Sequence, residues 1–116
     1  MTTRQKIAVR PLPPVVRVGP FDIRVVELDA GTGTDDYGQF SSDELEIRLR
    51  RDFVSPAMAA DTFIHEVLHA LWWVMNARAK DGEERIVTLL STGRTQFLRD
   101  NPAVLAWLRK SLARRR

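Results

Sequence analysis

The longest stretch without glycine or proline runs from Ala57 to Asp81, and it limits what the surrounding chain can fold into. Most of its residues favour helices, and Ser55-Pro56 before it is a typical helix start, with serine as N-cap and proline at the first helical position. Apolar residues recur in it at spacings of three and four: Phe63, Ile64, Val67, Leu68, Leu71 and Met75. This periodicity predicts a long, mostly buried helix.

The predicted helix contains His65-Glu66-x-x-His69, and these are the only two histidines in the chain. Residues four apart lie on one face of a helix, so both imidazoles can point a ring nitrogen at one metal ion, about 2 Å from each. Glu66 would then lie where its carboxylate can take a proton from a metal-bound water. The alternative is that both histidines are ordinary core residues and Glu66 is simply a helix former. Three residues that match the motif at its spacing favour the metal site.

A zinc hydrolase needs a third protein ligand. The chain has no cysteine and no further histidine, so this ligand must be a carboxylate. The site resembles that of a gluzincin, in which a glutamate on a following helix completes the set, and this resemblance points to Glu83 and Glu84. We prefer Glu84, which shares a helix face with small and apolar residues. The alternative is that Asp81 and Glu84 form a capping box without any metal.

Two further residues are candidates for supporting roles. Asp61, one turn before His65, could accept a proton from a ligating ring, although a backbone carbonyl could do the same. Tyr37, the only tyrosine, could donate to the oxyanion that forms during peptide hydrolysis.

The order of the predicted elements indicates an α+β domain. Residues 15–18 and 21–28 are expected to form a hairpin broken at Gly19-Pro20, and residues 29–38 a loop. Residues 44–50 alternate apolar and charged side chains, which predicts an antiparallel strand with one face in water, suited to a sheet edge. We therefore expect a small antiparallel sheet of about three strands followed by three helices, the first of which carries the motif.

The two later helices have their own signals. One is expected from Glu83, weakened or bent at Gly93. The last is expected to start at Asn101-Pro102, with asparagine as N-cap. Residues 1–14 are expected to be an extended lead-in, and residues 15–116 a single domain with a basic end.

Charge and hydropathy limit the expected partners and location. The net charge of +3 owes much to basic residues at the C-terminus: Arg109, Lys110, Arg114, Arg115 and Arg116. A solvated helix end explains them better than a nucleic-acid interface, because no DNA-binding motif accompanies them. No apolar run is long enough for a signal peptide or a membrane span, so a cytoplasmic location without membrane contact is expected.

The run Thr62-x-x-His65-Glu66-x-x-His69-Ala70 is preceded by Ile47-x-Leu49 and followed by Glu83-Glu84-x-Ile86-Val87. With the later stretch from Phe97 to Pro102, this pattern resembles the small metallopeptidase domains encoded by bacteriophages and prophages, over about residues 37–108. The resemblance implies a minimal gluzincin-like zincin in the host cytoplasm. It implies one zinc ion held by His65, His69 and Glu84, with Glu66 as general base. Thr88 departs from the pattern, because some relatives have an aspartate there that orients a histidine.

The expected function is therefore zinc-dependent hydrolysis of peptide bonds in a peptide or protein substrate. Two alternatives remain. One is a non-catalytic phage structural or adaptor protein with a zincin-like fold, which would bind a phage or host protein. The other is a zinc amidase that acts on cell-wall peptides. Glu66 favours an enzyme, because a purely structural metal site needs no base between its ligands.

Overall fold

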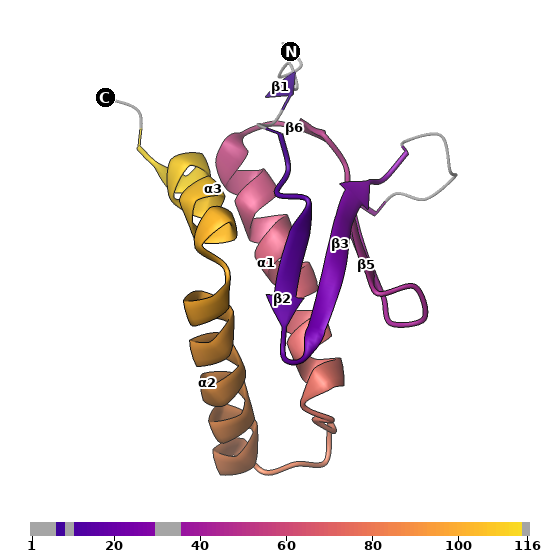
Figure 1. Ribbon diagram of the computed structural model, residues 1–116, viewed down its shortest axis with the longest axis vertical. Helices are drawn as coiled ribbons and strands as arrows, with labels where there is room; N and C mark the ends of the chain where they lie inside the picture. Colours follow the sequence, from indigo (N-terminus) through magenta and orange to yellow (C-terminus); the bar gives the residue numbers. More distant parts are fainter. Residues whose placement is uncertain (1–6, 9–10, 30–35, 115–116) are drawn as a thin grey trace, which may run out of the picture.

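The computed structural model describes residues 7–8, 11–29 and 36–114 (Figure 1). The described part of the chain contains six strands and three helices, in the order β1 (Ile7–Ala8), β2 (Val15–Val18), β3 (Phe21–Glu27), β4 (Gly38–Ser41), β5 (Glu46–Leu49), β6 (Asp52–Phe53), α1 (Pro56–Val74), α2 (Glu83–Asp100) and α3 (Pro102–Leu112). This is an α+β fold, as the sequence predicts. Most of the predicted lead-in, the centre of the predicted 29–38 loop and the last two arginines lie outside the described residues.

The main sheet has four strands in the order β2-β3-β5-β4. The β2–β3 hairpin is confirmed, and β4 and β5 are also antiparallel, but β3 and β5 run parallel. The sheet is therefore mixed, and the prediction of an antiparallel sheet of about three strands is wrong in this respect. The strand predicted at residues 44–50 lies inside the sheet rather than at its edge, because β4, which was not predicted as a strand from the sequence, occupies the edge. A separate short pair joins β1 to β6.

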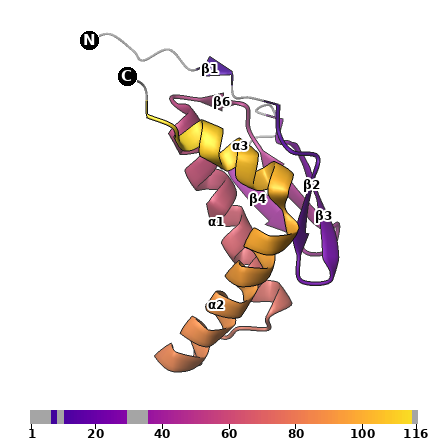
Figure 2. The same ribbon diagram turned by 60° about the vertical axis from the view of Figure 1, so that its left-hand side comes forward.

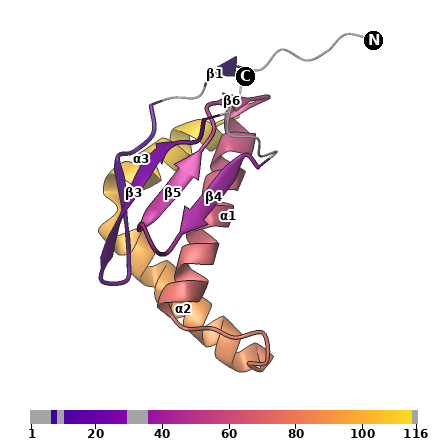
Figure 3. The ribbon, with the colours of Figure 1, turned by 90° about the vertical axis from the view of Figure 1, so that its right-hand side faces the viewer.

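One face of the sheet carries no helix of the described chain (Figure 3), and charged side chains alternate along β5 as predicted, although Glu46 is only 8% exposed. Glu46 accepts from Arg24 at 2.7 Å and from Arg48 at 3.3 Å, and Arg48 also pairs with Glu44 at 2.7 Å. The opposite face is covered by helices (Figures 1 and 3). The fold therefore has two layers, with its core between them.

Helix α1 lies against this covered face and contacts β2, β4 and β5 (Figure 3). Its predicted start is confirmed: Ser55 is the N-cap, and its hydroxyl accepts from the Met58 backbone N–H at 3.2 Å. The core residues that α1 contributes include Phe63, Val67, Ala70 and Leu71. The sheet faces them with Val16, Val18, Ile23, Val25, Ile47 and Leu49.

Two glycines allow close packing around α1. Gly19, in the β2–β3 turn, has a φ of +58°, and a Cβ there would lie 2.5 Å from Val74 Cγ1. Gly93 is buried, and a Cβ there would lie 2.7 Å from Leu71 Cδ2. Helix α2 continues through Gly93 from Glu83 to Asp100, so this glycine brings α1 and α2 together and does not end the helix.

The predicted N-cap position of Asn101 in α3 is confirmed, whereas the capping box considered as an alternative at the start of α2 is not formed. The N-cap of α2 is Gly82, and Asp81 instead accepts from the Arg78 backbone N–H at 2.8 Å. Asn101 occupies the N-cap position of α3, but its side chain makes no capping hydrogen bond. In both places a nearby tertiary or turn contact competes successfully for the polar side chain.

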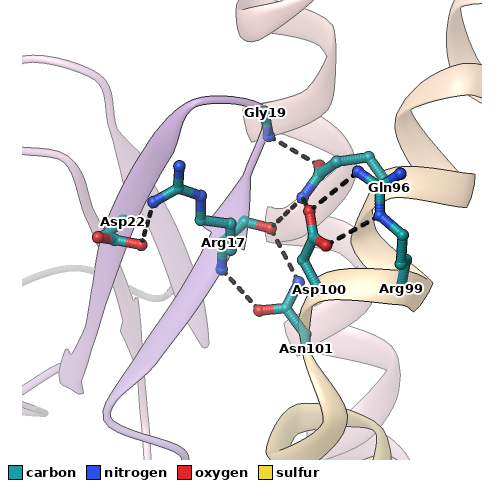
Figure 4. Close-up of polar contacts among 7 residues, drawn as sticks. All are labelled: Arg17, Gly19, Asp22, Gln96, Arg99, Asp100 and Asn101. Atoms are coloured by element: carbon teal, nitrogen blue, oxygen red, sulfur yellow. Dashed lines mark hydrogen bonds and ion pairs between the residues drawn. The ribbon is translucent and has the colours of Figure 1, made fainter.

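The Asn101 side chain instead binds the outer edge of β2 (Figure 4). Its Oδ1 accepts from the Arg17 backbone N–H at 2.6 Å, and its Nδ2 donates to the Arg17 carbonyl at 2.9 Å. Gln96 accepts from the Gly19 backbone N–H at 2.7 Å and also donates to the Arg17 carbonyl at 3.1 Å. These two amides pair the edge strand as a neighbouring strand would. They join β2 to the α2–α3 junction, and Figure 2 shows how the backbones of these elements lie.

No helix in the described residues combines the length and hydropathy that a membrane span requires.

Candidate metal centre

The two histidines of α1 have their ring nitrogens close together. Nε2 of His65 and Nε2 of His69 are 3.1 Å apart, and the ring centroids are 4.8 Å apart. Two nitrogens bound to one tetrahedral zinc ion, each about 2.0–2.1 Å from the metal, would be separated by about 3.3 Å. The observed separation is close to this value. In the absence of a metal, the same contact can be a hydrogen bond in which one ring donates to the other.

Glu66 lies between the histidines in sequence but is far more buried. Both histidines are exposed, whereas only 6% of Glu66 is accessible. Burial raises the pKa of the Glu66 carboxyl; His65 and His69 oppose this effect, and the negative charge of Asp36 adds to it. No hydrogen bond from the described residues stabilises the charged form. Two exposed histidines therefore lie beside a desolvated carboxylate on the same helix.

Strand β4 closes the site on one side. A Cβ on Gly38 would lie 2.9 Å from Thr62 Cγ2 and 3.1 Å from both Cγ and Oε2 of Glu66. The missing side chain therefore lets the first residue of β4 approach the motif turn of α1. This close approach contributes to the burial of Glu66.

A cavity of about 450 Å³ opens between β4 and α1. Its walls come from the segment around β4, which supplies Asp36, Gly38, Gln39, Phe40 and Ser42, and from α1, which supplies His65, Glu66, His69 and Trp73. Trp73 is held by Phe21 and Phe40, with ring centroids 5.3 and 5.9 Å away. The histidines and Glu66 therefore face one shared cavity.

A second cavity, of about 340 Å³, shares His65 and His69 with the first. Its other walls are Leu68 and Trp72, which are exposed apolar side chains of α1. The histidine pair thus lies between a largely polar space on the β4 side and an apolar space along the helix.

Glu84 does not line either of the cavities that His65 and His69 line. It is exposed in the first turn of α2, and its backbone carbonyl accepts from Thr88 Oγ1 at 2.8 Å. Glu83 is exposed beside it and lines neither cavity either. In the described ranges no three His, Cys, Asp or Glu side chains form a group that could hold a metal. The ligand role of Glu84 therefore stays a prediction.

The two supporting residues also lie outside the cavity lining. The Tyr37 ring packs on Phe53 at 5.3 Å, and the Arg50 guanidinium lies 4.3 Å above it. Asp61 is exposed on α1. Tyr37 nevertheless lies between two lining residues, Asp36 and Gly38, so its main observed contribution is to anchor this part of the cavity wall.

Sequence reasoning missed the contribution of Asp36 and β4. The glycines and aspartates of residues 29–38 predict a loop, and the alternation that predicts the next strand begins only at residue 44. A hairpin signal was present: Gln39, Phe40 and Ser41 precede the turn-forming residues Ser42 and Asp43.

The fold and site define an α+β protein whose first helix presents a His-Glu-x-x-His motif to the edge strand of a mixed sheet. Comparisons with protein-family models, curated proteins and solved structures give no match. The two converging imidazole nitrogens are donors that suit zinc, and carboxylates of the shared cavity could supply a third donor, although no three-residue metal group is formed in the described residues.

Proposed function

We propose that this protein is a zinc-dependent metallopeptidase. The observation that carries the proposal is the 3.1 Å separation of the two histidine Nε2 atoms beside the buried Glu66, at the wall of an open cavity. A pair of histidines kept only for packing would be expected to lie in the core, whereas both are exposed here.

Each residue has a distinct role in the proposed reaction. His65 and His69 would hold the zinc ion, which when bound acts as a Lewis acid on a carbonyl and makes water a better nucleophile near neutral pH. Glu66 would take a proton from water in the cavity and deliver it to the leaving amine. The pKa of Glu66, raised mainly by burial, makes its carboxylate a stronger base than an exposed glutamate.

Strand β4 offers a means of positioning a substrate. It pairs with β5 along one side, and on its other side no strand of the described chain pairs with it. Gly38, Gln39 and Phe40 of this strand also line the cavity. An extended peptide bound along β4 would therefore pass the histidine pair.

Glu66→Gln tests this proposal, because it removes the base and retains the shape of the side chain. A mixture of unstructured peptides is incubated with zinc-loaded wild type or variant, and cleavage is followed by mass spectrometry. We expect the variant to bind zinc normally but to cleave about 10²–10⁴-fold more slowly. Glu27→Gln, at an exposed position outside the cavity, is the control and should cleave like wild type. Equal rates for Glu66→Gln and wild type would contradict the proposed mechanism.

Two alternatives use the same motif and are separated by the same assay. A non-catalytic protein is favoured by the lack of a three-residue metal group in the described part of the chain, and it would bind zinc without cleaving any peptide. An amidase that acts on cell-wall peptides would cleave peptidoglycan fragments but not linear peptides, so both substrate types are included.

A further inference from the structure

We propose that Asp36 supplies the third protein ligand of the metal, from the segment that leads into β4. This inference rests on the proposed metal site, and it assigns to the loop a role that the sequence pattern gives to Glu84. It is carried by the position of Asp36, by the anchoring of the residues that follow it, and by the chemistry of the cavity.

Asp36 lines the same cavity as His65, His69 and Glu66. Two residues later, Gly38 lies against α1, because a Cβ there would point at Thr62 and Glu66. Asp36 therefore belongs to the short segment that enters β4 beside the motif helix.

The residue after Asp36 is firmly held. The Tyr37 carbonyl accepts from the Arg50 backbone N–H at 2.9 Å, and the Tyr37 ring is packed between Phe53 and the Arg50 guanidinium. This anchoring fixes the backbone that follows Asp36, next to the cavity that Asp36 lines. A ligand on a fixed backbone loses less conformational entropy when a metal binds.

The hydrogen bonding of Asp36 agrees with a third ligand at this position. Gln39 Nε2 donates to Asp36 Oδ2 at 3.4 Å. Ligating carboxylates are commonly oriented by such hydrogen bonds from neighbouring groups. Gln39 is therefore a positioning residue for Asp36.

Glu66 and Glu84 fit the ligand role less well. Glu66 is 6% exposed, lines the cavity and is needed as the base. Glu84 is exposed on a different helix and outside the cavity. Because the described residues show no closed three-residue metal group, the proposal requires Asp36 to rotate toward the histidines when the metal binds.

The test is a comparison of zinc affinities, measured by competition with a zinc-binding dye at fixed pH and ionic strength. We expect Asp36→Asn to weaken zinc binding by about 100-fold or more, and Gln39→Ala by about 10-fold. Glu84→Gln should stay within about threefold of wild type, since an exposed side chain outside the site makes no bond to the metal. Asp36→His replaces the carboxylate with another zinc ligand and should restore most of the affinity lost in Asp36→Asn.

The outcomes separate this inference from the proposed function. Normal zinc affinity in Asp36→Asn, or a large loss in Glu84→Gln, would overturn the role of Asp36 while leaving the metal site intact. Equal losses in Asp36→Asn and Asp36→His would also overturn it, because they would indicate a structural effect. If wild type itself binds no zinc, both the inference and the proposed function fail.

Discussion

The carboxylate of Glu66 and the backbone of Gly38 are in close contact across the junction of helix and sheet. A Cβ atom on Gly38 would lie 3.1 Å from Glu66 Oε2. This contact connects the fold to the candidate site, because it sets how near β4 comes to the motif and contributes to the removal of Glu66 from water.

Gly38→Ala should therefore disturb both stability and zinc binding. The new methyl group would meet Thr62 at 2.9 Å and Glu66 at 3.1 Å, so β4 or α1 must shift. Overpacking of this kind typically costs about 1–3 kcal/mol of unfolding free energy. Denaturant titration of the metal-free protein measures the cost. Gly82→Ala is the matched control, because a Cβ there meets no atom within 4 Å. Equal stability of the two variants would show that the Gly38 contact is unimportant.

Replacement of Glu66 should change the pH dependence of stability in the metal-free protein. Burial raises its pKa in the folded state, so the charged carboxylate lowers stability at pH values above its unfolded pKa, and protonation relieves this cost. Glu66→Gln should therefore be more stable than wild type at pH 7, and the difference should shrink as the pH falls towards about 4, the pKa of an unfolded glutamate. Denaturant titrations with a chelator at several pH values measure this. A difference that grows at low pH would contradict the assignment.

Asn101→Ala should be strongly destabilising although the residue lies far from the motif in sequence. The side chain is 5% exposed and hydrogen-bonds both backbone groups of Arg17 as well as the Phe97 carbonyl at 2.9 Å. Loss of these bonds should cost about 2–4 kcal/mol, since buried backbone groups lose their partners. Arg99→Ala is the control: its pair with Asp100 is exposed, and such pairs contribute about 0–1 kcal/mol. If Asn101→Ala lowered the unfolding free energy no more than Arg99→Ala, the hydrogen bonds of Asn101 to the edge of β2 would be shown to be unimportant for stability.

Zinc should raise the stability of wild type in a saturable way. A ligand that binds only the folded state adds about 2.7 kcal/mol to the unfolding free energy at a concentration of 100 times its Kd. Thermal unfolding with increasing zinc, and again after a chelator is added, measures the effect. His65→Ala should show almost none of it. A similar increase in that variant would place the zinc elsewhere on the protein.

Local chemistry made much of the fold predictable from the sequence. The start of α1 follows from Ser55 and Pro56, and the hairpin turn from Gly19, because each signal acts within a few residues. The order of the strands cannot be predicted from such local signals. The position of β5 between β3 and β4 depends on which segments pair across the chain, and the alternation of Ile47 and Leu49 with charged residues is the same at an edge or inside.

The candidate site likewise combines a feature that the local sequence predicts with features that depend on tertiary packing. The spacing of His65 and His69 fixes their geometry on any α-helix, so their convergence was predictable. The distance from the motif to Glu84 depends on how α2 packs, and Gly93 against Leu71 sets that contact. The nearness of Asp36 depends on β4, which was not recognised as a strand.

The central claim is that His65 and His69 bind one metal ion, and elemental analysis of purified protein tests it most directly. Wild type and His69→Ala are purified in parallel without chelator, incubated with zinc, and freed of excess metal. The account predicts about one zinc per wild-type chain and almost none in the variant, because a single imidazole cannot hold the ion. A wild-type protein without zinc, or a variant that retains it equally, would contradict the account.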